Sequence, residues 1–270
     1  MKDISIVIVN YLMRDDIAMC LRTLNDDLYG SSLNVQVVVV DNTPQDGCGL
    51  MLKKEYPSAL HIPQDHNIGF GKGVNIGLKA VEARYYFVLN PDTKFLPQTH
   101  TMERLFRFME DHPAVGMVGP KLLNEDGTLQ YSCYRFYTFW TPFLRRSSIG
   151  TSQKFKRVVD RFLMKDFDHA HIRPVDWIMG SAMFVRGSMM KEVGLMDERY
   201  FMYFEDSDWC RRFWDAHYPV YYVPEIVIKH RLARASAKGG FIRSILKNKL
   251  TRLHIMSWLK YMWKWRMLKV

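Results

Sequence analysis

Three short apolar runs constrain the fold of this chain more than any other feature. Residues 4–9, 35–40 and 85–89 are dominated by β-branched and aromatic side chains. Continuous runs of this length are typical of strands that are buried on both faces, as in a parallel sheet. Apolar residues at helical spacing lie between them, first over residues 15–28. This alternation predicts an α/β fold with a mostly parallel central sheet.

The rest of the chain continues the alternation less regularly. Further strands are expected at residues 60–62, 176–186 and 220–223, and further helices at residues 71–83, 98–111 and 206–216. Residues 124–172 have no clean period and are rich in Arg, Phe, Tyr and Ser. We interpret them as a long connection that partly covers a site.

Polar residues stand where the predicted strands end: Asn10, Asp41, Asn90 and Asp92. The carboxyl ends of parallel strands share one edge of an open α/β sheet, and ligands bind at that edge. Asn and Asp are also common turn formers and helix caps, which is the alternative for any one of them. Four at the same edge favour a binding site.

An acidic motif, Glu205-Asp206-Ser207-Asp208, lies between aromatic flanks at residues 200–204 and 209–213. Carboxylates held near apolar surface have a raised pKa, as a general base requires. The alternative is an acidic first helical turn that the helix dipole stabilises.

Glycines recur at positions 69, 71, 73 and 77, at the start of a predicted helix. Glycine lets the backbone approach a phosphate or sugar closely, and a helix N-terminus favours anions. The spacing matches neither a dinucleotide fingerprint nor a phosphate-binding loop ending in Gly-Lys-Ser/Thr.

A divalent cation site is a further possibility. Asp92 follows a strand directly, and Mg²⁺ is often held by one or two carboxylates plus substrate phosphates. His230 would add a nitrogen ligand, which suits Mn²⁺ better than Mg²⁺. The alternative for His230 is a structural, hydrogen-bonded histidine.

Charge is concentrated at the C-terminal end. Residues 226–270 hold twelve Lys or Arg and no Asp or Glu, and because the whole chain carries +10, the rest is close to neutral. This asymmetry predicts an anionic partner: a membrane surface, or less well a nucleic acid, since no nucleic-acid-binding module accompanies the charge. An apolar stripe at helical spacing predicts a tail helix whose basic, Trp-rich character suits a bilayer interface. The stripe consists of Ile242, Leu246, Leu250, Leu253, Met256 and Trp263. The alternative is a helix packed on the body of the protein.

Other bulk features limit the protein class. The four cysteines (Cys20, Cys48, Cys133 and Cys210) are scattered, so neither a zinc site nor a disulfide framework is expected, and a cytoplasmic setting fits. The first residues do not have the pattern of a signal peptide, and no apolar run reaches the length of a membrane span.

Six motifs in this order resemble glycosyltransferase family 2, in particular its rhamnosyltransferase-like branch. They lie at residues 5–11, 39–42, 67–75, 89–92, 176–180 and 204–208, and the resemblance covers residues 3–232. It implies a GT-A fold, a nucleotide-diphosphate sugar donor, a divalent metal (Mn²⁺ or Mg²⁺) and inversion at the anomeric carbon.

The resemblance also implies roles for individual residues. Asp206 corresponds to the catalytic base and Glu205 to its neighbour in the acceptor site. Asp92 is the metal-binding carboxylate of a shortened DxD motif whose first position is Asn90, and His230 completes the metal shell. The donor-binding residues are Asn10, Tyr11, Asp41, Asn67, Gly69, Gly71, Asn75, Asn90, Trp177 and Gly180.

We therefore expect a catalytic domain at residues 1–238 and a basic helical tail at residues 239–270. The expected activity transfers L-rhamnose from dTDP-L-rhamnose to a glycan or polyprenyl-diphosphate-linked acceptor of bacterial surface polysaccharide, at the inner face of the plasma membrane. One alternative donor is a UDP-hexose. The other alternative is a degenerate transferase domain that only binds a membrane or protein partner.

Overall fold

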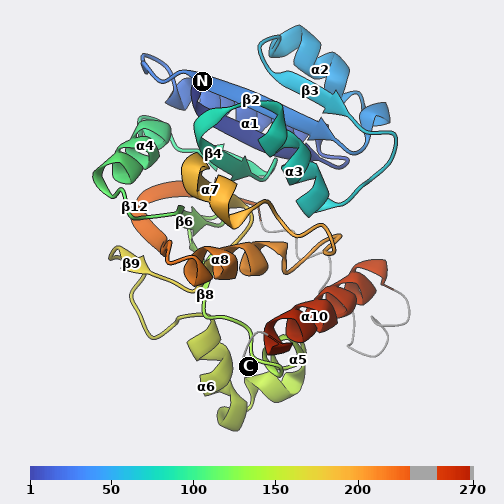
Figure 1. Cartoon of the computed structure of the whole chain (residues 1–270), viewed down its shortest axis with the longest axis vertical. Coiled ribbons are helices and arrows are strands. Elements are labelled where there is room, and N and C mark those ends of the chain that lie inside the picture. Colours follow the sequence, from blue (N-terminus) through green and yellow to red (C-terminus); the bar gives the residue numbers. More distant parts are fainter. Residues whose placement is uncertain (232–247, 268–270) are drawn as a thin grey trace.

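The computed structural model describes residues 1–231 and 248–267 (Figure 1). Within them, a ten-stranded mixed sheet forms the centre of the molecule. Its strand order is β3 (Leu60–Pro63), β2 (Val35–Asp41), β1 (Lys2–Asn10), β4 (Ala83–Leu89), β11 (Ala182–Arg186), β6 (Met117–Leu123), β12 (Val220–His230) and β5 (Thr93–Phe95). Two short strands, β7 (Leu129–Gln130) and β9 (Arg173–Pro174), pair with β6 and β12.

The helices cover both faces of this sheet and one end of the molecule. They are α1 (Arg14–Asp27), α2 (Cys48–Glu55), α3 (Phe70–Ala80), α4 (Thr101–Asp111), α5 (Thr141–Arg146), α6 (Gln153–Phe162), α7 (Gly187–Val193), α8 (Glu205–Asp215) and α10 (Lys249–Met267), with short 3-10 turns η1 (Pro44–Asp46) and η2 (Ser148–Thr151). Figure 1 shows α2 at one end of the long axis, and α5, α6 and α10 at the other.

The central position of β1 in the sheet, with both of its faces buried, explains why its apolar run is unbroken. It pairs in parallel with β2 on one side and β4 on the other. Successive side chains of a strand point to opposite faces. Ile4, Ile6 and Ile8 belong to the core that includes α1 and α4, whereas Val7 and Val9 belong to the core that includes α3 and α8. The α/β fold class is confirmed.

The second half of the sheet is mixed, because β11 runs antiparallel to β4 and β6. The single strand expected at residues 176–186 is wrong in one respect. It is divided into β10 (Trp177–Ile178), which pairs with β8 (Cys133–Tyr134) in a separate two-stranded sheet, and β11. Gly180 lies in the break, where its N–H donates to the Asp206 carboxylate instead of to a ladder partner.

Strand β12 is longer than the expected residues 220–223. Its pairing with β6 shifts register between Val223 and Val227. Pro224 lies within this shift and has no N–H to donate, which is the usual setting for proline in a strand. The strand then continues to His230, which lies opposite Thr93 of β5.

The C-terminal helix α10 packs on the body through a face that the apolar stripe does not predict. Tyr261 and Trp265 are buried against Tyr200 and Phe204. Residues 232–247, including Ile242 and Leu246 of the stripe, lie outside the described residues. The other stripe residues are partly or largely exposed, with Met256 and Trp263 the most open.

Candidate active site

The strand ends come together as expected around Asn10 and Asp41, which are adjacent in the β1–β2 register. Both are fully buried. The Asn10 amide donates to Asp41 Oδ1 at 2.8 Å and to Asp46 Oδ2 at 2.9 Å. Tyr11, the next residue, is exposed. The parallel register places Asn10 beside Asp41, and the turn after β2 adds Asp46, so that these residues form an acidic hydrogen-bonded cluster.

His61 also belongs to this cluster, and the sequence analysis did not identify it. Its Nε2 lies 2.9 Å from Asp41 Oδ2, while the Thr43 N–H donates to Asp41 Oδ1 at 3.0 Å. The signal was its position in β3, next to β2 in the sheet. Both oxygens of Asp41 thus have protein partners, which fixes the carboxylate in one orientation.

Asp41, Asp46 and Cys48 bring potential metal ligands within 4.8 Å of one another. Burial raises the pKa of the Cys48 thiol to about 12, so the thiol stays protonated at neutral pH. The two carboxylates already accept the Asn10 amide. These three residues therefore form a hydrogen-bonded cluster. Among the described residues, Asp92 and His230 are the better candidates for a cation site.

The glycine-rich turn lies against the segment that precedes the acidic motif. Gly69 has a φ of +91°, and a Cβ there would lie 2.4 Å from the Phe201 carbonyl oxygen. The N–H of Phe70 donates to that same oxygen at 2.9 Å, and Asn67 Oδ1 accepts the Gly69 N–H at 2.9 Å. Gly71 is close to Glu205, whose Cβ is 3.6 Å from the position of an added Cβ. The N-terminus of α3 and that of α8 are therefore neighbours.

Two predicted donor-binding residues have structural contacts instead of an open side chain. The Asn75 amide donates to the Met196 carbonyl at 2.8 Å and accepts the Met196 N–H at 2.9 Å, so it ties α3 to the loop before α8. Trp177 is buried, stacks on Tyr134 and donates to the Arg135 carbonyl at 2.8 Å. Both side chains therefore hold neighbouring segments of the chain in place.

Asp92 and His230 are brought together as the cation hypothesis requires. Asp92 Oδ1 lies 3.2 Å from His230 Nε2, and both side chains are buried. The Asn90 amide nitrogen is 3.4 Å from the same Nε2 and 3.3 Å from Ser181 Oγ. A carboxylate oxygen beside an imidazole nitrogen is a donor set that suits Mn²⁺.

Gln130 orients His230, and the sequence gave no sign of it. Its amide nitrogen donates to Asn124 Oδ1 at 2.9 Å and to the His230 carbonyl at 3.1 Å. Its Oε1 therefore faces His230 Nδ1, at 2.6 Å. If Nδ1 donates to Gln130, a neutral imidazole has its Nε2 lone pair available for a cation placed between Nε2 and Asp92. Partners of this kind set the tautomer of metal-binding histidines.

The acidic motif begins α8. Glu205 and Asp208 are buried and Asp206 is partly buried. Burial raises the pKa of Asp206 to about 6, although N–H donors from Gly180 (3.0 Å) and Ser207 (2.7 Å) oppose the rise. Burial, with Asp206 and Asp208 nearby, holds the pKa of Glu205 well above its usual range. Asp206 is thus the carboxylate suited to accept a proton near neutral pH.

The turn before α8 is strained. Tyr203 and Phe204 both have a φ of +71°, a left-handed conformation that aromatic residues rarely adopt. Such residues cost on the order of 1–3 kcal/mol each and persist only where the surroundings hold them. Phe204 is held between Tyr137 and Tyr261, at ring-centroid distances of 4.6 and 5.4 Å.

Sequence comparisons identify the family of this chain. A family model described as glycosyl transferase family 2 matches residues 5–168. An N-acetylglucosaminyl-diphospho-decaprenol L-rhamnosyltransferase of Mycobacterium tuberculosis is 28% identical over 223 residues, which cover 76% of this chain and 69% of the relative. The rhamnosyltransferase WbbL of Escherichia coli is 25% identical over 272 residues, covering 97% and 94%.

Solved structures show the same fold at low identity. Staphylococcus aureus TarS 1–349 aligns with a TM-score of 0.55 at 14% identity, over 85% of this chain and 60% of TarS. The mannosyltransferase PcManGT from Pyrobaculum calidifontis, solved with GDP-Man and Mn²⁺, aligns with a TM-score of 0.54 at 15% identity, over 87% and 60%. This chain has a GT-A fold, and it belongs to glycosyltransferase family 2, on the rhamnosyltransferase-like branch.

Proposed function

We propose that this protein is an inverting, metal-dependent hexosyltransferase that moves L-rhamnose from dTDP-L-rhamnose to a lipid-linked or oligosaccharide acceptor. One observation carries the proposal: a partly buried carboxylate, Asp206, with a pKa raised to about 6, lies against Gly180, which the ring of Phe70 at the α3 N-terminus also approaches. The names of the rhamnosyltransferase relatives support the sugar and the lipid-linked acceptor.

In the proposed reaction, Asp206 accepts the proton of an acceptor hydroxyl while that oxygen bonds to the anomeric carbon. The bond from that carbon to the diphosphate oxygen breaks in the same step, and its electron pair leaves with the nucleoside diphosphate. One displacement inverts the anomeric configuration and needs no covalent carboxylate, unlike a retaining glycoside hydrolase. The Gly180 N–H keeps the base pointed at the site.

Asp92 and His230 would hold the divalent ion, which stabilises charge on the departing diphosphate when bound. Asn10, Asp41 and His61 would hold the nucleobase end, because Asp41 Oδ2 has a single protein partner, His61, and is able to accept one more hydrogen bond. Glu205, whose pKa is held above its usual range by burial, would lie beside the base in the acceptor site.

The proposal also includes binding to an anionic membrane surface through the end of the molecule that holds α5, α6 and α10 (Figure 1). Met256, Leu259 and Trp263 are exposed at i, i+3 and i+7 and so share one face of α10. No described helix is long and apolar enough to span a bilayer. Association would therefore be interfacial.

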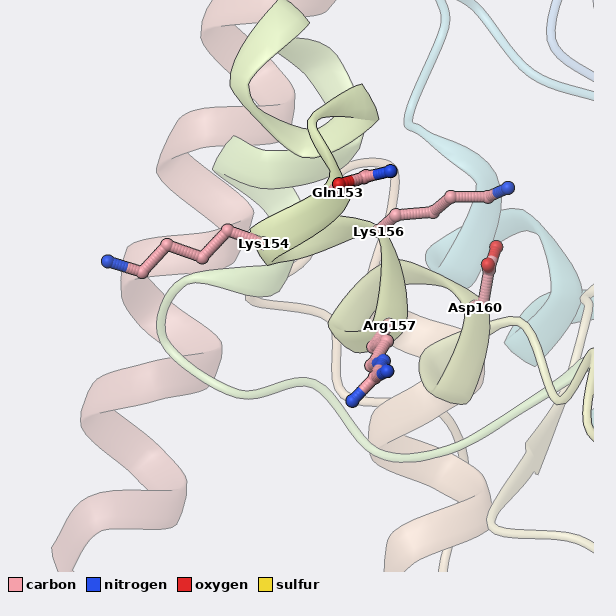
Figure 2. A pocket seen from close by; sticks show the side chains of 5 residues that line it. All are labelled: Gln153, Lys154, Lys156, Arg157 and Asp160. Atoms are coloured by element: carbon pink, nitrogen blue, oxygen red, sulfur yellow. The ribbon is translucent and has the colours of Figure 1, made fainter.

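Residues 139–157, which precede β9 in the sequence, extend this surface. Phe139 and Trp140 are exposed, and the Phe139 ring lies 5.0 Å from Trp258 of α10. Lys154, Lys156 and Arg157 project from α6, where they line a surface hollow (Figure 2). Aromatic side chains flanked by cations suit the headgroup region of an anionic bilayer.

Turnover with defined donors tests the proposed function. The purified protein is incubated with Mn²⁺, a polyprenyl-diphosphate-linked N-acetylglucosamine acceptor, and either dTDP-L-rhamnose or a UDP-hexose. We expect transfer from dTDP-L-rhamnose, loss of transfer with EDTA, and an inverted anomeric configuration by NMR. Faster transfer from the UDP-hexose would replace the donor, and no turnover with any donor would overturn the enzyme assignment.

A further inference from the structure

Helix α10 reaches the acidic motif through a buried ion pair. Asp208 lies two residues after Asp206, and its side chain is fully buried. Lys264 Nζ is 2.7 Å from Asp208 Oδ1 and 2.9 Å from Oδ2, and Trp265 Nε1 donates to Oδ1 at 3.0 Å. Arg212 Nε of α8 itself donates to Oδ2 at 3.1 Å. The Tyr200 hydroxyl donates to Oδ1 at 3.5 Å, so two of the four described residues that donate to this carboxylate come from α10.

The same helix also holds the strained turn on the other side of the motif. Ser257 Oγ donates to the Met202 carbonyl at 2.8 Å, and Ser207 Oγ donates to the Tyr261 hydroxyl at 3.3 Å. Lys264 Nζ additionally bridges to Asp197 at 2.9 Å. Contacts on both sides of residues 203–204 mean that α10 fixes both the entry to α8 and its first turn.

The charge on Lys264 matters because three carboxylates share four positions. An uncompensated negative charge at Asp208 would favour protonation of its neighbours. Asp208 is one of the charges that raise the pKa of Glu205, and Lys264 and Arg212 compensate the Asp208 charge through ion pairs of 2.7 and 3.1 Å. The other titratable groups that face the Asp208–Lys264 pair are Asp197, Arg199, Tyr200, Glu205 and Tyr261.

We propose that Lys264 and Trp265 are positioning residues for the base Asp206: they fix Asp208 and the first turn of α8 from a helix more than 50 residues away in the sequence. This inference rests on the proposed function. It gives the C-terminal helix a second role, because its inner face sets the catalytic carboxylate while its outer face presents Met256, Leu259 and Trp263.

Lys264→Met tests the inference, with Lys260→Met as a matched control. Lys260 is also on α10 and donates to the Arg199 carbonyl at 2.7 Å, but it makes no contact with Asp208 among the described hydrogen bonds and ion pairs. In the full-length protein, we expect Lys264→Met to lower kcat roughly 10- to 100-fold, as a misplaced catalytic group does. The KM for the donor changes little, and the acidic limb of the pH–rate profile moves to higher pH. Lys260→Met leaves kcat and the limb unchanged.

Trp265→Phe is the second variant, because it keeps an aromatic ring for the Arg211 guanidinium, now 4.2 Å from the Trp265 ring, and removes only the N–H donor. We expect a smaller fall in kcat with an unchanged melting temperature. An unshifted pH limb and wild-type kcat in Lys264→Met would overturn the inference, as would equal losses in the Lys260 control. Inactive wild-type protein would instead count against the proposed function, so the two failures are distinguishable.

Discussion

The two halves of the site are built differently. At the proposed nucleotide end, Asn10, Asp41 and His61 stand on adjacent parallel strands, and the sheet register brings them together. At the acceptor end, Asp206 depends on Gly180, on a strained aromatic turn and on α10. Secondary structure thus positions the nucleotide residues, whereas tertiary packing positions the base. Variants at the two ends should therefore affect different kinetic constants.

Asp206→Asn should separate the two ends most strongly. The amide still accepts the Gly180 N–H but cannot take a proton, so we expect kcat to fall roughly 100- to 10,000-fold. Nucleotide affinity, measured by calorimetry, should not change, because the nucleotide residues lie on other strands. A variant that retains wild-type turnover would show that another group is the base.

Gln130→Leu tests the cation site between the two ends. Without its Oε1, the His230 ring loses the partner that orients it, and we expect Mn²⁺ affinity in the presence of dTDP to fall roughly 10- to 100-fold. Calorimetric titration measures this without turnover. Gln36→Leu, which removes an amide that donates to the Ser58 carbonyl, is the control. Equal Mn²⁺ affinity in both variants would remove Gln130 from the site.

Asp41→Asn tests the nucleotide end. Replacing the carboxylate by a neutral amide weakens its hydrogen bonds, and we expect the Kd for dTDP to rise roughly 10-fold. At saturating donor, kcat should stay near the wild-type value. Asp26→Asn, an exposed carboxylate on α1, serves as control. A fall in kcat with an unchanged Kd would contradict the proposal that the two ends affect different kinetic constants.

The smallest expected effect concerns the membrane surface. Trp263→Ser should weaken sedimentation with phosphatidylglycerol vesicles several-fold, because one exposed indole contributes only part of the buried apolar area. Leu50→Ser removes an exposed apolar side chain from α2, at the opposite end of the molecule (Figure 1), and should have no effect. Equal vesicle binding by both variants would exclude the α10 face.

The sequence predicted the nucleotide end better than the acceptor end for a physical reason. Asn10 and Asp41 follow unbroken apolar runs, and parallel pairing of neighbouring strands then determines where they lie. Asp92 and His230 meet because β5 and β12 pair at Thr93 and His230, a contact that the family resemblance anticipated and strand periodicity did not. Contacts that depend on the pairing of neighbouring strands can be inferred from the local sequence pattern.

Contacts set by side-chain geometry could not be inferred. Gln130 lies 100 residues from His230, and neither residue type nor spacing indicates their hydrogen bond. The apolar stripe of the tail did not indicate which face of α10 packs on the body, because Met256 and Trp263 of the stripe are exposed. The inner face of α10 instead includes Ser257 and Lys264, which are satisfied by the Met202 carbonyl and by Asp208.

The pH dependence of kcat/KM tests the proposed role of Asp206 as the base most directly. A base must be deprotonated to act, and the pKa of Asp206 is raised to about 6. We therefore expect the rate to rise with pH through a single acidic limb near pH 6, measured between about pH 5 and about pH 8. The limb should be absent from the residual activity of Asp206→Asn. A flat profile, or the same limb in that variant, would contradict the assignment of Asp206 as the base.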